Sequence, residues 1–334
     1  MSPIAILSGE ATIYWSSLVI AFGLAACLCL SLALYLPHGG RSAGMALFMC
    51  LTVFFSVPLC RILHWYCHME QYGSIMAALT DFSIGSYCIP GILPAALLSA
   101  LLVYKLGFAD SIGKLLDAFV PGACLGLAFI RLSALFDVTC RGKMSFQQPF
   151  LQHLPLASAV TNSSGGVDYR FATFFVHFII LLLMSFLMLR VYGKRRKTPM
   201  LSGSESGHVA RLFLLYYCAV ELVLDSTRYD ASFMPFNSFI SMVQVICALC
   251  MLSLLVYYSI HAIRSRGMSF KVALLWILFL LGVALVGGSE YMVQRHSSWY
   301  LGCYSVMSVG SLVMVLPIKQ LYLLCCHRKK DFAQ

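Results

Sequence analysis

Nine long apolar stretches run through the 334-residue chain, and they restrict its fold more than any other feature. A helix needs ~20 residues to cross the hydrocarbon core of a membrane, and most of the stretches reach that length. The sixth stretch is short and carries Glu221, so its ends are the least well defined. The nine stretches cover approximately residues 12–36, 44–66, 82–104, 118–136, 171–189, 209–224, 236–260, 270–287 and 301–324.

The composition excludes a water-soluble fold. Apolar residues make up 60% of the chain and charged residues only 11%, whereas soluble domains contain roughly 25% charged residues. The sequence therefore predicts an all-α, polytopic integral membrane protein with about nine transmembrane helices.

The basic residues predict how these helices are oriented. If the amino terminus lies outside the cytoplasm, most Lys and Arg residues fall in the inner loops, as the positive-inside rule requires. An even number of helices would break this alternation, so the carboxyl terminus is expected in the cytoplasm. The inner basic residues are Arg41, Lys105, Lys114, Arg190, Lys194, Arg195, Arg196, Lys197, Arg264, Arg266, Lys271, Arg328, Lys329 and Lys330.

The net charge of +10 is then explained by the anionic inner leaflet, which attracts the basic inner loops. The expected partner is therefore the membrane, and no nucleic acid partner is expected. No cofactor or metal site is predicted. Cys247-x-x-Cys250 has no second Cys pair, and His64 with His68 has no third ligand. The long outer connection at 137–170 has no obvious structure of its own, and such a connection is typically functional or mobile.

Charged residues inside the apolar stretches point to a polar site, because burying charge in hydrocarbon is unfavourable. Arg61 shares a helical face with His64 and His68, and Glu221 shares one with Asp225 and Arg228. In the predicted topology these faces and Arg131 end at the same outer surface, which favours a shared polar chamber. The alternatives are snorkelling of Arg61 and Arg131 to the headgroups and a structural ion pair for Glu221.

The residues around Arg131 resemble the signature of the bacterial prolipoprotein diacylglyceryl transferase family, G-R-x-G-N-F-x-N-x-E-x-x-G. Arg131 and Gly142 match it, and Asp137 stands at the second Asn. The chain departs from the signature at Ala134 and Thr139, which replace the first Asn and the Glu.

Further segments are similar to the family in order and setting. Arg61 resembles the arginine of its second helix, and Glu221 matches the Glu of an R-x-x-x-E-x-x-R segment, where Arg228 is a candidate substitute for one arginine. Gln244 matches the Gln at the start of the last family helix. The His-Gly-Gly of the third helix is replaced by Ile89-Pro90-Gly91.

The resemblance implies a seven-helix transferase-like core over residues 1–262 and a two-helix extension with a basic cytoplasmic tail over 263–334. It implies transfer of diacylglyceryl from phosphatidylglycerol, or another anionic lipid, to the lipobox cysteine of a prolipoprotein at the bacterial cytoplasmic membrane. The implied catalytic residues are Arg131, Glu221 and His64, and the implied substrate-binding residues are Arg61, Asp137, Gly142, Arg228 and Gln244.

Other readings stay open at this point. His64, His68 and Glu221 are all candidates for the base that takes the thiol proton, because the family's His is absent. The lost polar positions also fit a non-catalytic lipid-binding or accessory relative. An unrelated transporter is the third reading, although the sequence contains no internal repeat of the kind many transporters have.

Overall fold

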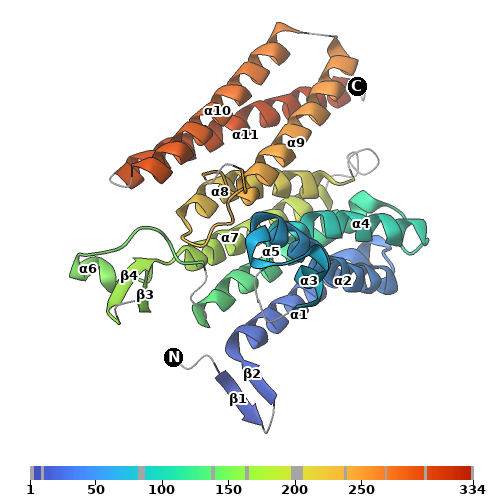
Figure 1. Ribbon diagram of the computed structural model, residues 1–334. Coiled ribbons are helices and arrows are strands. Elements are labelled where there is room, and N and C mark those ends of the chain that lie inside the picture. Colours follow the sequence, from blue (N-terminus) through green and yellow to red (C-terminus); the bar gives the residue numbers. More distant parts are fainter. Residues whose placement is uncertain are drawn as a thin grey trace. The chain divides into compact units, whose positions relative to one another are not determined.

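The computed structural model describes residues 4–8, 11–81, 87–136, 140–161, 165–196, 206–236, 239–267, 269–296 and 299–331, and helices dominate it (Figure 1). Within these residues, seven helices are long and apolar enough to cross a membrane. The prediction of an all-α multi-pass membrane protein is confirmed. The helices are α1 (Trp15–Tyr35), α2 (Ser42–Cys67), α3 (Ile75–Thr80), α4 (Ile92–Lys105), α5 (Ile112–Ser133), α6 (Pro149–Gln152), α7 (Thr173–Arg196), α8 (His208–Thr227), α9 (Met242–Arg266), α10 (Phe270–Arg295) and α11 (Tyr300–Asp331).

All nine predicted stretches contain a helix, but two of these helices do not qualify as spans on their own. Residues 82–86 of the third stretch lie outside the described residues, and the described part forms the 3-10 turn η3 (Ile89–Gly91) and α4, which has 14 residues. Pro90 suits the first turn of η3, because proline lacks a backbone N–H and has a fixed φ angle. In the sixth stretch, α8 carries Arg211, Glu221 and Asp225, which lower its hydropathy.

The chain forms two compact units. Unit 1 contains Met1–Phe213 and Thr227–Asp230, and unit 2 contains Leu214–Ser226 and Ala231–Gln334. The functional division at residue 262 stays a prediction.

In unit 1, α1 and α5 pack closely through small residues. A Cβ atom added at Gly122 would lie 2.6 Å from the carbonyl oxygen of Cys27, and one added at Gly23 would lie 2.5 Å from the Cβ of Phe129. Gly126 faces Cys27 in the same way. Small residues at such crossings let two backbones approach, which is how helices associate where both are surrounded by lipid.

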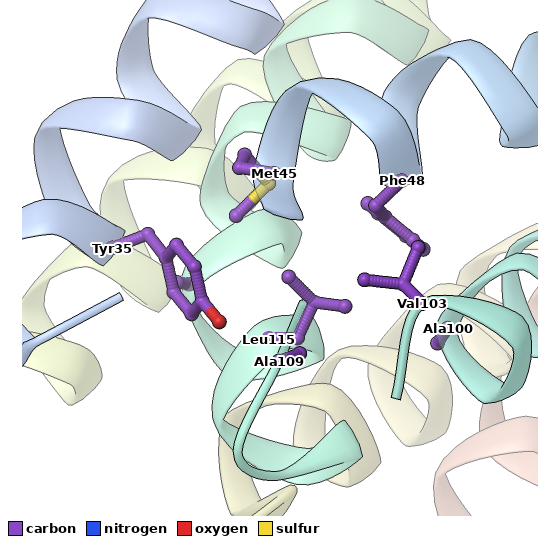
Figure 2. Close-up of a cluster of buried hydrophobic side chains, with 8 residues drawn as sticks. Tyr35, Met45, Phe48, Ala100, Val103, Ala109 and Leu115 are labelled. Atoms are coloured by element: carbon purple, nitrogen blue, oxygen red, sulfur yellow. The ribbon is translucent and has the colours of Figure 1, made fainter. Parts of the chain in front are cut away.

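A hydrophobic cluster joins α1, α2, α4 and α5 at one end of these helices (Figure 2). Met45 and Phe48 of α2 are fully buried against Val103 and Leu115. The Phe48 ring also meets the Phe119 ring edge to face, with centroids 4.8 Å apart. The full cluster is Tyr35, Met45, Phe48, Ala100, Val103, Ala109, Leu115 and Ala118.

The connection over residues 137–170, in which the sequence shows no obvious structure, contains two strands among its described residues. Strands β3 (Ala157–Thr161) and β4 (Val167–Phe171) form an antiparallel pair in which Ser158 faces Arg170. Residues 142–146 extend this arrangement, because Ser145 pairs with Arg170 and Gly142 pairs with Arg228. The alternation of Val167, Tyr169 and Phe171 with polar residues explains the strand, since aromatic and β-branched side chains suit a half-buried sheet. A second hairpin, β1 (Ile4–Ser8) with β2 (Ala11–Tyr14), precedes α1.

Asp117 of α5 fixes the start of α8. Its two carboxylate oxygens accept the backbone N–H groups of Gly207 and Ala210, at 2.8 and 3.0 Å. The first N–H groups of a helix have no partner within the helix, and a carboxylate there also suits the helix dipole.

Candidate functional site

Arg131 lies in the last turn of α5 and is only 3% exposed. Its Nη1 donates to the Sγ of Cys140 over 3.6 Å. Cys140 adopts a left-handed backbone conformation, with φ of 56°. Its carbonyl accepts the N–H of Phe174 at 3.2 Å, and its own N–H donates to Oδ2 of Asp230 at 3.0 Å. The Cys140 turn therefore connects the end of α5 with the start of α7 and with the segment after α8.

Arg228 and Asp230 form an ion pair with two contacts beside this turn. Nε of Arg228 lies 3.2 Å from Oδ1 of Asp230, and Nη2 lies 3.0 Å from Oδ2. The backbone of Tyr229, between them, donates to the carbonyl of Arg141 at 2.8 Å. We call Arg131, Cys140, Arg228 and Asp230 the Cys140 network.

Gly142 stands where the chain backbone passes close to the end of β4. Its N–H donates to the carbonyl of Phe171 at 2.7 Å. A Cβ atom at this position would lie 2.7 Å from the Cβ of Phe171 and 2.9 Å from its carbonyl oxygen, so a larger residue does not fit. Three residues predicted for the site, Arg131, Gly142 and Arg228, thus lie on neighbouring segments. A direct role for Gly142 in substrate binding stays a prediction.

The network sits in basic surroundings. The segments 140–146, 167–171 and 227–230 contain four basic and two acidic residues, and Arg131 adds a fifth cation. The guanidinium of Arg141 is buried over the Phe174 ring, 4.4 Å from its centroid, and that of Arg170 lies 4.6 Å from the centroid of Tyr229. Guanidinium groups are the preferred partners of carboxylates and phosphates, so these surroundings favour an anionic ligand.

Asp230 titrates below its ordinary range. Burial by itself raises the pKa of its carboxyl, but Arg228 and the N–H groups of Cys140 and of Asp230 itself outweigh burial and hold the pKa below the usual value. Asp230 was not among the site residues predicted from the sequence. Its position two residues after Arg228 was the available signal, because residues at that spacing in an extended segment share a face.

Arg61 is 1% exposed, and its guanidinium bonds to groups of the protein itself. Its Nε donates to the carbonyl of Ala78 at 2.9 Å and its Nη2 to the carbonyl of Asp81, both at the carboxyl end of α3. The rings of Tyr72 and Tyr87 lie 5.7 and 5.3 Å from its guanidinium carbon. Arg61 therefore does not snorkel to the surface, and its role toward substrate stays a prediction.

His64 lies next to Arg61 on α2. Its Nδ1 is 3.1 Å from the hydroxyl of Tyr72, and its ring stacks on that of His68 with centroids 4.3 Å apart. The three residues of the predicted face are thus close together around Tyr72. Among the described residues, no group of three His, Cys, Asp or Glu side chains is arranged to hold a metal ion.

In unit 2, buried polar groups connect α8 with α9. Glu221 is 1% exposed and Asp225 is fully buried. Oδ2 of Asp225 accepts the hydroxyl of Ser241 at 2.5 Å. Ser241 and Gln244 form a capping box at the start of α9, in which each side chain accepts the other's backbone N–H. The Ser-x-x-Gln pattern was the sequence signal for this start.

The amide nitrogen of Gln244 has two further contacts, to the carbonyl of Leu222 at 3.3 Å and to Oε2 of Glu290 at 2.9 Å. Glu290 belongs to α10 and was missed by sequence reasoning. Asp137 lies outside the described residues. Arg131 and Glu221 belong to different units, so their predicted meeting stays a prediction.

The position of the family's lost histidine is occupied by the turn η3. The half-buried Ile89 there is aliphatic, and its carbonyl accepts a long contact of 4.0 Å from the thiol of Cys60. The N–H of Cys88 donates to the carbonyl of Cys60 at 3.2 Å, and a Cβ atom at Gly91 would lie 2.6 Å from the nitrogen of Cys60. The turn is packed tightly on α2, and the aliphatic side chain of Ile89 cannot take up a proton.

A family model described as prolipoprotein diacylglyceryl transferase matches residues 3–260. No curated protein matches the chain. The matched region ends within α9, so α10 and α11 lie beyond it.

Proposed function

Because this chain belongs to the prolipoprotein diacylglyceryl transferase family, we propose that it moves a diacylglyceryl group from phosphatidylglycerol to a lipobox cysteine of a prolipoprotein. The family acts in lipoprotein biosynthesis, and the seven apolar helices make the chain a multi-pass membrane protein. The distribution of basic residues supports an amino terminus outside and a carboxyl terminus in the cytoplasm. The resemblance to a bacterial family supports a location in the bacterial cytoplasmic membrane.

The observation that carries the proposal is the contact of Arg131 in its basic surroundings. The Nη1 of this buried guanidinium meets a thiol, 3.6 Å away, and sulfur is a weak acceptor. A phosphate oxygen would accept from the same guanidinium much more strongly. Arg131, helped by Arg228, would therefore hold the phosphate of the lipid headgroup.

The proposed reaction forms one bond and breaks one. The sulfur of the lipobox cysteine attacks the phosphate-bearing carbon of the diacylated glycerol. A C–S bond to that carbon forms, and its C–O bond to the phosphate breaks. Glycerol phosphate leaves with the electron pair, and Arg131 stabilises its charge. The thiol proton passes to a base, because a free thiol is mostly protonated near neutrality. Glu221 and His64 are the other two proposed catalytic residues, and both, together with His68, are candidates for this base.

The test uses the purified protein in liposomes with labelled phosphatidylglycerol and a lipobox peptide. The expected product is a thioether-linked diacylglyceryl peptide, formed by the wild type and lost in Arg131→Ala. Arg190→Ala is the control, because Arg190 lies over the ring of Phe186 in α7 and away from the Cys140 network. A wild type that forms no thioether would contradict the proposal.

A non-catalytic lipid-binding or accessory role is the second candidate. Ile89 favours it, because an aliphatic residue stands where the family has a histidine. This role predicts that the protein binds phosphatidylglycerol liposomes without forming product, and that it fails to rescue a strain depleted of the authentic transferase. Rescue would exclude it. Solute flux through the reconstituted protein, lost in Arg131→Ala, would instead favour a transporter.

A further inference from the structure

The segment of α8 around Glu221 receives three hydrogen bonds from other helices. The carbonyl of Ala219 accepts from the hydroxyl of Ser311 at 2.6 Å. The carbonyl of Leu222 accepts from the amide of Gln244 at 3.3 Å, and that of Ser226 accepts from the hydroxyl of Tyr304 at 3.3 Å. The carbonyls of Ala219 and Leu222 lie within the helix and already accept an N–H from the next turn, so their donors use the second lone pair. Ser226 lies in the last turn of α8, where helix carbonyls have no N–H partner within the helix.

Two of these donors come from outside the region that matches the family. Tyr304 and Ser311 lie seven residues apart on one face of α11, and both are buried. The third donor, Gln244, is held by α10, because its amide donates to Oε2 of Glu290. Oε1 of Glu290 accepts the amide of Gln294 at 2.7 Å, which fixes the carboxylate in turn.

The α10–α11 pair is tightly packed, so it can present these side chains in a fixed position. A Cβ atom at Gly282 would lie 2.9 Å from the carbonyl of Gly310, and one at Gly310 would lie 2.9 Å from the Cβ of Leu285. Such close backbone packing restricts sliding and rotation of one helix on the other.

We propose that α10 and α11 hold residues 219–226 of α8, and with them the Glu221 carboxylate, in the position that the reaction needs. Tyr304, Ser311 and Glu290 are positioning residues in this view. The inference rests on the proposed function of Glu221. Positioning matters because a displacement of about 1 Å at a reacting group costs about a hundredfold in rate.

The alternative is that these bonds only fasten helices together, and matched variants separate the two. Tyr304→Phe and Ser311→Ala each remove one hydroxyl that reaches α8. Ser308→Ala is the control, because the Ser308 hydroxyl donates to the carbonyl of Tyr304 in its own helix at 2.7 Å. The control loses a comparable hydrogen bond from α11 without touching α8.

The kinetic measurement is the transferase assay with varied phosphatidylglycerol. The double variant Tyr304→Phe/Ser311→Ala should lower kcat by roughly tenfold to a hundredfold, as expected for two lost hydrogen bonds, with KM for the lipid unchanged. Ser308→Ala should keep the wild-type kcat. An unchanged kcat in the double variant, or an equal loss in Ser308→Ala, would overturn the inference.

Amide hydrogen exchange separates this inference from the proposed function. Peptides covering 219–226 should exchange faster in the double variant than in the wild type and in Ser308→Ala. If the wild type forms no thioether but this difference appears, only the proposed function fails and α10 and α11 still hold α8. If exchange over 219–226 is the same in all three proteins, the holding role itself is wrong.

Discussion

The carboxylate of Asp230 accepts hydrogen bonds from two nitrogens of Arg228, with Nε 3.2 Å from Oδ1 and Nη2 3.0 Å from Oδ2. The same Oδ2 accepts the N–H of Cys140, so one carboxylate fixes both a cation and the turn that faces Arg131. The basic residues of the proposed lipid site thus depend on an acidic residue that need not touch the substrate.

Asp230→Asn should weaken the transferase reaction by loosening Arg228. An amide keeps the shape but loses the charge, so the effect on stability should be small, about 1 kcal/mol or less for a partly exposed pair. The assay should show a raised KM for phosphatidylglycerol at low salt. Asp168→Asn is the control on β4, and an equal change in both variants would contradict a specific role for Asp230.

The stability contributed by Asp230 should depend on pH. Because the pKa of its carboxyl is lower in the folded protein than in the unfolded chain, the folded state binds fewer protons there. The contribution is therefore present above the unfolded pKa of about 3.9 and is lost as the pH falls through the lower folded pKa. Thermal unfolding in detergent should show a gap between wild type and Asp230→Asn at pH 7 that closes on acidification. A gap of constant size would contradict the assignment.

Arg131→Lys should be impaired even though it keeps the positive charge. An ammonium group cannot reproduce the paired N–H donors that a guanidinium offers to phosphate. We expect a loss of about tenfold for Arg131→Lys and of about a hundredfold for Arg131→Ala in the labelled-lipid assay, from the usual strength of hydrogen bonds to charged groups. Membrane insertion should be unchanged. Near-normal activity of the lysine variant would show that charge alone matters.

Glu221→Gln should abolish the reaction while leaving insertion intact. The substitution preserves size and removes only the ionisable carboxyl, so a lost product would reflect chemistry or charge at this position. Glu70→Gln is a suitable control, because Glu70 is an exposed residue of the 3-10 turn after α2. Full activity of Glu221→Gln would remove Glu221 from the site.

Arg61→Lys should lower stability, whatever it does to activity. Lysine cannot bond the carbonyls of Ala78 and Asp81 together while lying between two tyrosine rings. We expect a loss of about 2 kcal/mol, the usual size for a buried, charge-assisted hydrogen bond. Arg41→Lys is the matched control, because Arg41 also donates to a carbonyl, that of Gly107, but is exposed. Equal midpoints of thermal unfolding for both variants would contradict the role of Arg61.

Gly122→Ala should destabilise the packing of α1 on α5. The added methyl group would lie 2.4 Å from the Ser31 hydroxyl and 2.6 Å from the Cys27 carbonyl, and overpacking of this kind typically costs about 1–3 kcal/mol. Gly193→Ala is the control, because nothing lies within 4 Å of its added Cβ atom. It should be neutral or stabilising, since alanine favours a helix over glycine. A Gly122→Ala protein as stable as the wild type would contradict the close approach.

The parts of this molecule that sequence reasoning reached are those that depend on local pattern. Apolar runs of membrane-spanning length predicted the helices, and the spacing of Arg61, His64 and His68 predicted their common face. The Cys140 network was not foreseen as a whole, because the N–H of Cys140 and its acceptor Asp230 are 90 residues apart in the chain. Only pairing of segments 140–146 and 227–230 brings them together. Pro90 in the first turn of η3 is a local signal of the same kind.

The seam between α1 and α5 has a consequence for how a lipid could arrive. At Gly23 and Gly122 the two helices lie so close that even one added methyl group collides, and at Gly126 it would lie 3.2 Å from the Cβ of Cys27. An acyl tail is wider than a methyl group, so it cannot pass between α1 and α5 at these glycines. Arg131 lies little more than a turn beyond Gly126 on α5. A two-tailed substrate would therefore have to reach Arg131 by a route that does not pass between α1 and α5.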